Sequence, residues 1–286
     1  MHIQNAADSF FELYKEVDCL SLQDLDTYYA QYPDIFKEYF QYHCPKTEER
    51  LTAAIERYPS QIEELKLVAN RLPTIIESVM DRFKVLFGTK LDLNFHIFVG
   101  GYGSNAFVER KIIGDVYFAI EKLSSDPAHL EVIVAHEIGH IYHNYLSDQA
   151  GIKWSEVDWE HGVTSLYREG IATYLSMLTA NSGQNESIYF SYDDEGDEWL
   201  QFCKENHRKI AERFLEDAGQ WSFDKEREWF RLSGGSYFGF NRLGYYLGTC
   251  FVQDYVKKRN KEAVITLWTS EDLESVISEW LREQVI

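Results

Sequence analysis

The spacing of apolar residues changes at Gly88, and that change limits the class of fold. Before Gly88, apolar side chains recur every three or four residues, the spacing of a helix packed on one face. Examples are Ile62, Leu65, Val68 and Leu72. After Gly88, residues 91–99 alternate between apolar and polar side chains, which is typical of a strand, and residues 114–120 do so again. We therefore expect a mainly helical α+β protein, with a helical N-terminal region at 1–88 and a second domain at 89–286 that contains a small β-sheet.

Local signals divide the N-terminal region into helices. Residues 60–63 (Ser-Gln-Ile-Glu) form a capping-box pattern and predict a helix start. Pro73 is expected to interrupt that helix because it lacks a backbone N–H, and residues 74–77 repeat the pattern and predict a new start. The new helix should end at Gly88. The aromatic residues of this region are expected to lie in the core: Tyr28, Tyr29, Phe36, Tyr39 and Phe40.

Boundaries in the second domain follow from glycine, proline and acidic residues. The glycines within residues 100–103 predict a flexible turn after the first strand. Asp126 followed by Pro127 is typical of a helix start, and the helix should reach about Tyr145. The acidic residues 193–198 are expected to form a loop in an otherwise helical remainder.

The composition excludes several classes of function. The chain has 286 residues, with 47 acidic against 28 basic side chains and a formal net charge of −19. Nucleic acids and anionic membranes bind cationic surfaces, so we expect neither as a partner. The start of the sequence does not resemble a signal peptide, and no segment reaches the roughly 18 consecutive apolar residues of a membrane-spanning helix. The four cysteines are widely separated, which favours reduced thiols and a cytoplasmic protein.

The helix predicted to start at Pro127 carries His-Glu-Ile-Gly-His at residues 136–140. The two histidines are one helical turn apart, so both imidazoles can reach one metal ion. Glu137 lies between them and can hydrogen-bond a water on the metal rather than the metal itself. We therefore expect His136 and His140 to bind Zn²⁺ and Glu137 to be the catalytic carboxylate.

A catalytic zinc ion usually has three protein ligands, so this helix leaves one to be supplied elsewhere. His143 is about 10 Å from His136 along the helix axis, too far to share the ion, and is expected to lie behind the ligands or at the surface. Glu169 lies in a continuous predicted helix, on a face of small side chains that would let the first helix approach. Glu160 lies near the start of that helix, where an acidic residue complements the helix dipole. We take Glu169 as the third ligand and keep Glu160 as the alternative.

The two segments together resemble a known group of enzymes. His136–His140 combined with Glu-Gly-Ile-Ala-Thr-Tyr at 169–174 is similar to the gluzincin metallopeptidases, whose third ligand is a Glu on a second helix. The layout looks closest to the uncharacterised bacterial predicted zinc-dependent proteases, which have a Gly-Tyr-x-x-Gly helix resembling residues 244–248. This resemblance implies a zincin-like catalytic domain that hydrolyses peptides or proteins, with Zn²⁺ on the three ligands and Glu137 as general base. It does not extend to the N-terminal third.

The resemblance leaves the oxyanion-stabilising group and the substrate path open. Negative charge that develops on the substrate oxygen needs a nearby donor. The candidates are Tyr237, Arg242, Tyr245 and Tyr246. Gly244 and Gly248 would permit close packing of the helix at 244–248. A peptide substrate is expected along the strand at 116–120, if that strand is an edge of the sheet.

Two other functions compete with the peptidase. The chain could be a non-catalytic binding module of zincin fold, although an intact Glu137 weighs against a purely structural site. It could also be a metal-dependent hydrolase of a non-peptide bond. The sequence does not decide between endopeptidase and exopeptidase activity, nor does it give the oligomeric state.

Overall fold

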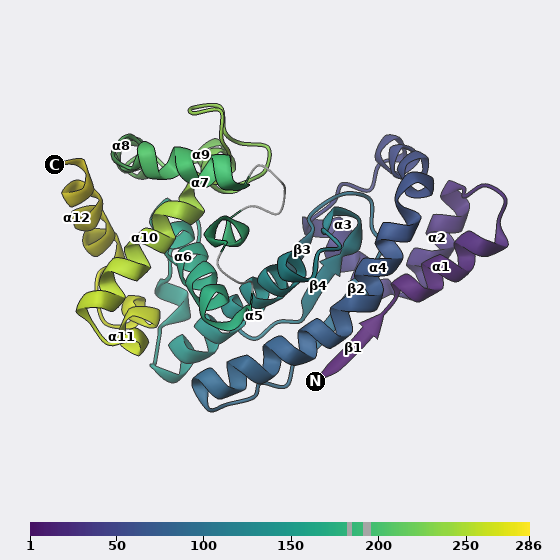
Figure 1. The fold of residues 1–286 in the computed structure, drawn as a ribbon, viewed down its shortest axis with the longest axis horizontal. Helices are drawn as coiled ribbons and strands as arrows, with labels where there is room; N and C mark the ends of the chain where they lie inside the picture. The colour runs from purple at the N-terminus through teal and green to yellow at the C-terminus, as the bar shows by residue number, and fades with distance from the viewer. Residues whose placement is uncertain (182–184, 191–195) are drawn as a thin grey trace. The chain divides into compact units, whose positions relative to one another are not determined.

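The computed structural model describes residues 1–181, 185–190 and 196–286, which fold as two compact units, Met1–Glu137 and Ile138–Ile286. Most of these residues are helical, and the strands form one small sheet (Figure 1). This confirms the predicted α+β class with mainly helical content. Of the predicted acidic loop at 193–198, residues 193–195 lie outside the described residues, and residues 196–198 form the first turn of α7 (Gly196–Glu205). The loop prediction is therefore wrong for residues 196–198, where Asp197 and Glu198 lie at the N-terminal end of a helix and complement its dipole.

The first unit contains a four-stranded sheet with the order β1–β2–β4–β3. β1 (His2–Asn5), β2 (Asn94–Phe98) and β4 (Val116–Ala119) run parallel, and β3 (Ala106–Val108) runs antiparallel to β4. β4 is therefore hydrogen-bonded on both sides. The expectation that residues 116–120 could be a sheet edge open to a peptide is wrong, because β2 and β3 already occupy both edges of that strand.

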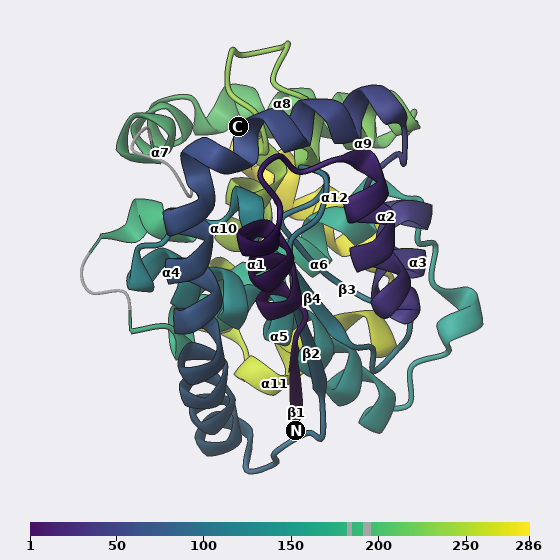
Figure 2. The same ribbon diagram turned by 90° about the vertical axis from the view of Figure 1, so that its right-hand side faces the viewer.

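β1 is a strand within the N-terminal region, which the sequence predicted to be helical. Its four residues, His-Ile-Gln-Asn, are too few to show an alternating pattern. Ile3 lies opposite Phe95, and Gln4 lies opposite His96. Figure 2 shows β1 extending from the N-terminus beside β2. The strand is thus defined by its pairing with a distant segment, a signal that local sequence does not carry.

Three short helices gather the aromatic side chains of the N-terminal region: α1 (Ala7–Glu16), α2 (Leu22–Gln31) and α3 (Pro33–Tyr42). Ser21 starts α2 through reciprocal side-chain and backbone hydrogen bonds with Asp24. The predicted aromatic core is confirmed for the four buried residues Tyr28, Tyr29, Phe36 and Tyr39. Phe40 is only half-buried.

α4 (Glu48–Phe87) is one uninterrupted helix (Figure 1). The helix starts predicted at residues 60–63 and 74–77 are therefore wrong. The helix begins instead after Thr47, whose hydroxyl oxygen accepts a hydrogen bond from a backbone N–H in the first turn. It ends at Gly88 with φ 70°, as predicted.

The helix continues through Pro73 because one buried stripe extends on both sides of it. The stripe consists of Leu65, Val68, Leu72, Ile76 and Val79. An interior proline costs a helix about 3 kcal/mol. Burial of each apolar side chain contributes about 1.5–3 kcal/mol, so the packed face outweighs the interruption.

α5 (Pro127–Gln149) begins in the first unit and continues into the second. The second unit further contains α6 (Gly162–Thr179), α7 (Gly196–Glu205), α8 (His207–Ala218), α9 (Phe223–Phe230), α10 (Leu243–Lys258), α11 (Lys261–Ile265) and α12 (Leu273–Val285). Short 3₁₀ turns occur at η1 (Ile120–Lys122), η2 (Trp154–Glu156), η3 (Glu186–Tyr189) and η4 (Leu267–Thr269). α10 packs against α6, and α12 packs against α8. Within the described residues, no helix combines the length and apolar character needed to cross a bilayer.

Candidate metal centre

α5 begins where the sequence predicts and is buried along most of its length. The Asp126 carboxylate accepts a hydrogen bond of 2.7 Å from the backbone N–H of Ala128, and Pro127 is the first helical residue. Three fully buried side chains anchor the helix: Leu130, Val134 and Ile141. His136 and Glu137 are also buried, with 4% and 7% of their surface exposed. Because α5 is fixed on its apolar side, its polar side chains are held in place as well.

The structure brings together His136, His140 and Glu169. Each offers one potential ligand atom, and these atoms all lie within 4.8 Å of one another. His140 Nε2 is 3.4 Å from Glu169 Oε2. The two histidines come from α5, and the glutamate comes from α6. Three donors thus converge on a volume that one metal ion could occupy.

Small residues let α6 approach α5 in the second unit. A Cβ on Gly139 would lie 3.2 Å from the carbonyl oxygen and 3.3 Å from the Cα of Ala172. α6 is started by His161, whose Nδ1 accepts the backbone N–H of Val163 at 3.2 Å. Gly139 therefore permits the backbone of α6 to lie close beside the histidine helix.

Charged side chains surround Glu169. Burial lowers the pKa of Arg168, while the carboxylates of Glu169 and Glu226 act in the opposite direction. Burial raises the pKa of Glu226, and Glu169 contributes to that increase. Glu226 accepts a hydrogen bond of 2.9 Å from the Ser165 hydroxyl, one turn before Glu169 on α6. The Arg168 guanidinium also lies 5.0 Å from the ring centroid of Trp159. The negative charge of Glu169 is thus partly balanced by its neighbour in the chain.

His143 is fully buried and so does not lie at the surface, one of the two places expected for it. Its ring stacks on Trp268 with 4.5 Å between centroids, and Tyr167 contacts it edge-on at 5.1 Å. Burial lowers the pKa of His143 well below 6.5, so the imidazole is neutral at pH 7. Its described ring contacts are thus with α6 and with the 3₁₀ turn η4.

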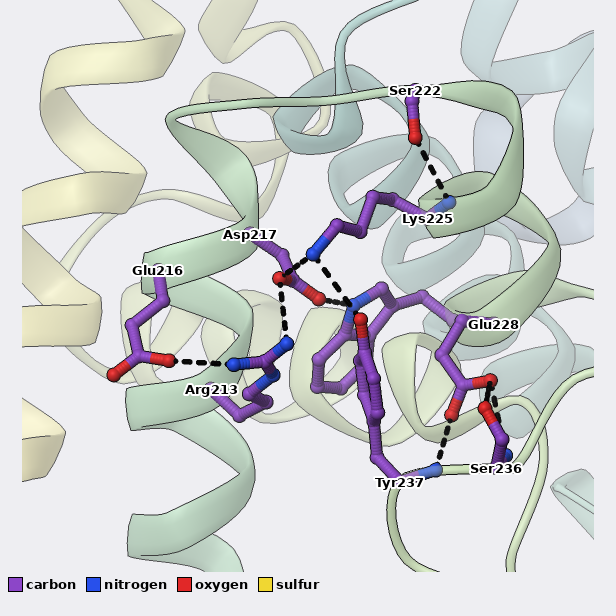
Figure 3. A network of polar contacts seen from close by, with 9 residues as sticks. Arg213, Glu216, Asp217, Ser222, Lys225, Glu228, Ser236 and Tyr237 are labelled. Carbon is purple, nitrogen blue, oxygen red and sulfur yellow. Dashed lines mark hydrogen bonds and ion pairs between the residues drawn. The ribbon is translucent and has the colours of Figure 1, made fainter.

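Tyr237, a candidate for oxyanion stabilisation, belongs to the polar network in Figure 3. Its hydroxyl accepts a hydrogen bond of 3.1 Å from Lys225 Nζ, and Lys225 also forms an ion pair with the buried Asp217. The Arg213 guanidinium lies 4.3 Å from the centroid of the Tyr237 ring. The Glu228 carboxylate accepts the backbone N–H of Tyr237 and fixes the loop that carries it.

The other candidates lie on or beside α10. Arg242 is buried with φ 56°, and its guanidinium lies 5.9 Å from the ring centroid of Tyr245. Tyr245 interacts electrostatically with Arg168, the neighbour of Glu169. The Tyr246 hydroxyl is 3.2 Å from the His207 ring, so it is directed to α8. Glu160, the alternative candidate for the third ligand, is exposed and lies before the start of α6.

Three residues near the ligands were given no chemical role from the sequence, although Thr173 was counted among the small residues on the face of Glu169: Arg168, Thr173 and Glu226. Arg168 and Thr173 lie within the segment around Glu169. The charge of Arg168 and the hydroxyl of Thr173 could have indicated from the sequence that both residues interact with the metal centre. Glu226 follows Ser165 by 61 residues, and only the packing of α9 beside α6 brings their side chains together. No local pattern could have identified that contact.

The donor set fits a zinc ion. Two imidazole nitrogens and one carboxylate oxygen are a common protein ligand set of catalytic zinc, which keeps a further position for water or substrate. Glu137 follows His136 directly, and its carboxylate is not among the three converging donors.

Comparison with known proteins gives one match. Residues 8–258 match the model of the family described as "Putative zinc dependent peptidase (DUF5700)". No curated protein and no solved structure matches the chain. The matched region contains the converging histidines and glutamate and covers most of the sequence. The chain therefore belongs to this family.

Proposed function

We propose that the protein is a metallopeptidase in which His136, His140 and Glu169 hold a zinc ion and Glu137 is the general base. One observation carries this assignment: the ligand atoms of the three residues lie within 4.8 Å of one another, in a chain of this family. The combination of two histidines and a glutamate on a second helix is that of the gluzincins, which the motif resembles.

A bound zinc ion would polarise the scissile carbonyl and increase the acidity of a water beside it. Glu137 accepts the proton of the attacking water and then donates it to the leaving amine. Its burial supports this role, because a carboxylate shielded from solvent transfers protons to the substrate rather than to bulk water. Arg168 places a positive charge beside Glu169 and partly balances its negative charge.

We assign Tyr245 as the first candidate to stabilise the oxyanion. It interacts electrostatically with Arg168, which in turn interacts with Glu169. Tyr237 is a weaker candidate because its hydroxyl is engaged by Lys225, and Arg242 is weaker because its side chain is buried beside Asn241. A phenolic O–H can donate a hydrogen bond to the developing negative charge.

The decisive experiment combines metal analysis with a peptide library. The purified protein should contain about one zinc ion per chain and should cleave peptides, and a chelator should abolish the cleavage. Glu137→Gln should retain zinc and melting temperature but lose at least about 100-fold in kcat. Glu160→Gln, which alters an exposed glutamate, is the matched control and should behave as the wild type.

Each alternative predicts a different result. A binding module would hold zinc without cleaving any peptide in the library. A hydrolase of another bond would leave peptides intact yet hydrolyse ester or amide probes in a Glu137-dependent way. A wild type that binds no zinc, or a fully active Glu137→Gln, would contradict the metallopeptidase.

The third ligand is tested separately. Glu169→Ala should weaken zinc binding by more than about 100-fold. The substitution removes a metal ligand, whereas loss of a residue that only orients a ligand costs about 10–100-fold in metal affinity. Glu160→Ala should leave the affinity unchanged. Zinc affinity measured by competition with a chromophoric chelator distinguishes the two, and the reverse result would move the third ligand to Glu160.

A further inference from the structure

α5 and α6 lie close together at Gly139, directly beside the potential ligand His140. Gly139 meets the backbone of Ala172, as its hypothetical Cβ would lie 3.2 Å from the carbonyl oxygen. The next residues along the two helices are His140 and Thr173. Thr173 also follows Glu169 by four residues, one helical turn on the same face. Its side chain therefore belongs to the face of α6 that carries the glutamate.

The Thr173 hydroxyl differs from two other buried hydroxyls of α6, those of Ser176 and Thr179. Ser176 Oγ donates to the carbonyl of Thr173, and Thr179 Oγ1 donates to the carbonyl of Leu175, each at 2.7 Å. Both hydroxyls are thus satisfied by their own helix. Thr173 is fully buried, and its Oγ1 has no hydrogen-bond partner among the described residues. A buried hydroxyl without a hydrogen-bond partner lowers the free energy of unfolding by about 1–3 kcal/mol. Its presence at this position therefore needs an explanation.

The orientation of His140 suggests that reason. Its Nε2 faces Glu169 at 3.4 Å, so Nε2 is the ring nitrogen directed to the ligand cluster. A histidine that binds metal through one nitrogen donates the N–H of the other to an oxygen acceptor, which fixes the tautomer and the ring orientation. An oxygen placed where α5 and α6 meet can serve as that acceptor.

We propose that Thr173 is a positioning residue of the metal centre, whose Oγ1 accepts the Nδ1–H hydrogen bond of His140 when the ion is bound. The assignment rests on the proposed function in that His140 must be a ligand. It extends that function by naming the group that orients the ligand, one turn beyond Glu169 on the second helix.

The experiment measures zinc affinity by chelator competition in four proteins: the wild type, Thr173→Val, Thr173→Ser and Thr179→Val. Thr173→Val keeps the shape of the side chain and removes the hydroxyl, so affinity should fall by about 10–100-fold. Thr173→Ser restores the oxygen and should return affinity to near the wild-type value. Thr179→Val removes a buried hydroxyl that its own helix satisfies, and its zinc affinity should match that of the wild type.

The metal-free proteins provide a readout that separates positioning from packing. Metal-free Thr173→Val should melt at the wild-type temperature or above it, because it loses only an unsatisfied polar group. Cobalt(II) substituted for zinc should show altered visible absorption bands in Thr173→Val but not in Thr179→Val. Thr173→Ala, which favours the helix, replaces the valine variant in the same comparison if the latter does not fold.

Failure of this inference can be told from failure of the metal centre. A wild type without zinc would overturn the proposed function itself. A wild type that binds zinc, together with a Thr173→Val variant of equal affinity, would overturn the role of Thr173 alone. A loss of melting temperature without a loss of zinc affinity would likewise identify Thr173 as a packing residue.

Discussion

Glu121 is a buried carboxylate that has no part in the proposed chemistry and holds the glycine-containing turn of the first unit. It accepts the backbone N–H of Gly100 at 3.0 Å and that of Tyr102 at 2.8 Å. Tyr39 donates to it and also accepts the backbone N–H groups of Gly101 and Gly103. The turn that the sequence predicted to be flexible is therefore tied to buried side chains at each of its residues.

The stability contributed by Glu121 should depend on pH. Burial raises the pKa of this carboxyl above 4.5, so the folded protein binds its proton more tightly than the unfolded chain does. Between the unfolded and folded pKa values, stability therefore falls as pH rises. We expect the free energy of unfolding of the wild type, relative to Glu121→Gln, to increase as pH is lowered from 8 to 4.5 in urea titrations.

An exposed cap provides the comparison for Glu121. Asp272 caps α12, and hydrogen bonds from Ser275 lower its pKa below 3.8. It does not titrate above pH 4.5, so the difference between the wild type and Asp272→Asn should stay constant over the same range. A constant difference for Glu121→Gln as well would contradict the protonation of Glu121 in the folded state.

At the scale of the elements, the contact of α6 with α10 depends on two glycines. A Cβ on Gly170 would lie 2.4 Å from the backbone of Gly248, and one on Gly248 would lie 2.2 Å from the carbonyl oxygen of Leu166. Neither distance is compatible with a side chain. The close packing that the sequence predicted for Gly248 is confirmed, and it is made against the residue that follows Glu169.

Gly248→Ala should destabilise the protein although alanine favours a helix. The propensity gain is about 1 kcal/mol, whereas forcing two backbones apart costs about 1–3 kcal/mol or more. We expect a net loss of roughly 1–2 kcal/mol, and a lower zinc affinity because α6 shifts together with Glu169. Thermal melting and chelator competition measure the two effects.

Gly219→Ala is the control for this substitution. Gly219 has φ −72°, and its nearest neighbour to a new Cβ is 3.8 Å away, so the protein should be unchanged or slightly more stable. If Gly248→Ala melted like Gly219→Ala, the helices would not be in contact as described.

Elements with end signals of their own were predicted best. α5 starts at Pro127, where Asp126 and Pro127 mark the start, and α6 starts at Gly162, near the expected start beside Glu160. The interruption of α4 at Pro73 was wrong because packing on both sides outweighs the local penalty. β1 was missed because four residues carry no period, and the position of β4 inside the sheet depends on strand order, which local sequence does not encode.

The convergence of His136, His140 and Glu169 was expected from the sequence, whereas the contacts around them were not. His136 and His140 are linked by helical spacing, and Glu169 was chosen for the character of its helix face. The partnership of Glu226 with Ser165 and the hydrogen-bonding state of Thr173 follow from contacts between helices. Residue identity suggests such roles, but only three-dimensional packing assigns them.

At the scale of the whole molecule, the charge of −19 bears on substrate selection. A chain with this excess of acidic groups surrounds itself with a negative potential, which raises the local concentration of cations and speeds their encounter with the protein. The range of that potential is set by salt: the Debye length is about 30 Å at 0.01 M and about 8 Å at 0.15 M. Attraction of a cationic peptide is therefore a low-salt effect.

We expect kcat/KM for a peptide rich in Lys and Arg to fall several-fold, on the order of 10-fold, as NaCl is raised from 10 to 200 mM. The same peptide with its lysines acetylated and its arginines replaced by glutamine should show little change, because it carries no charge for the field to act on. Initial rates at substrate concentrations far below KM report this quantity directly. The comparison uses one enzyme, one buffer series and two peptides of equal length, so an effect of salt on the fold would lower both rates together. Parallel salt dependence for the two peptides would mean that the net charge of the chain has no role in selecting the substrate.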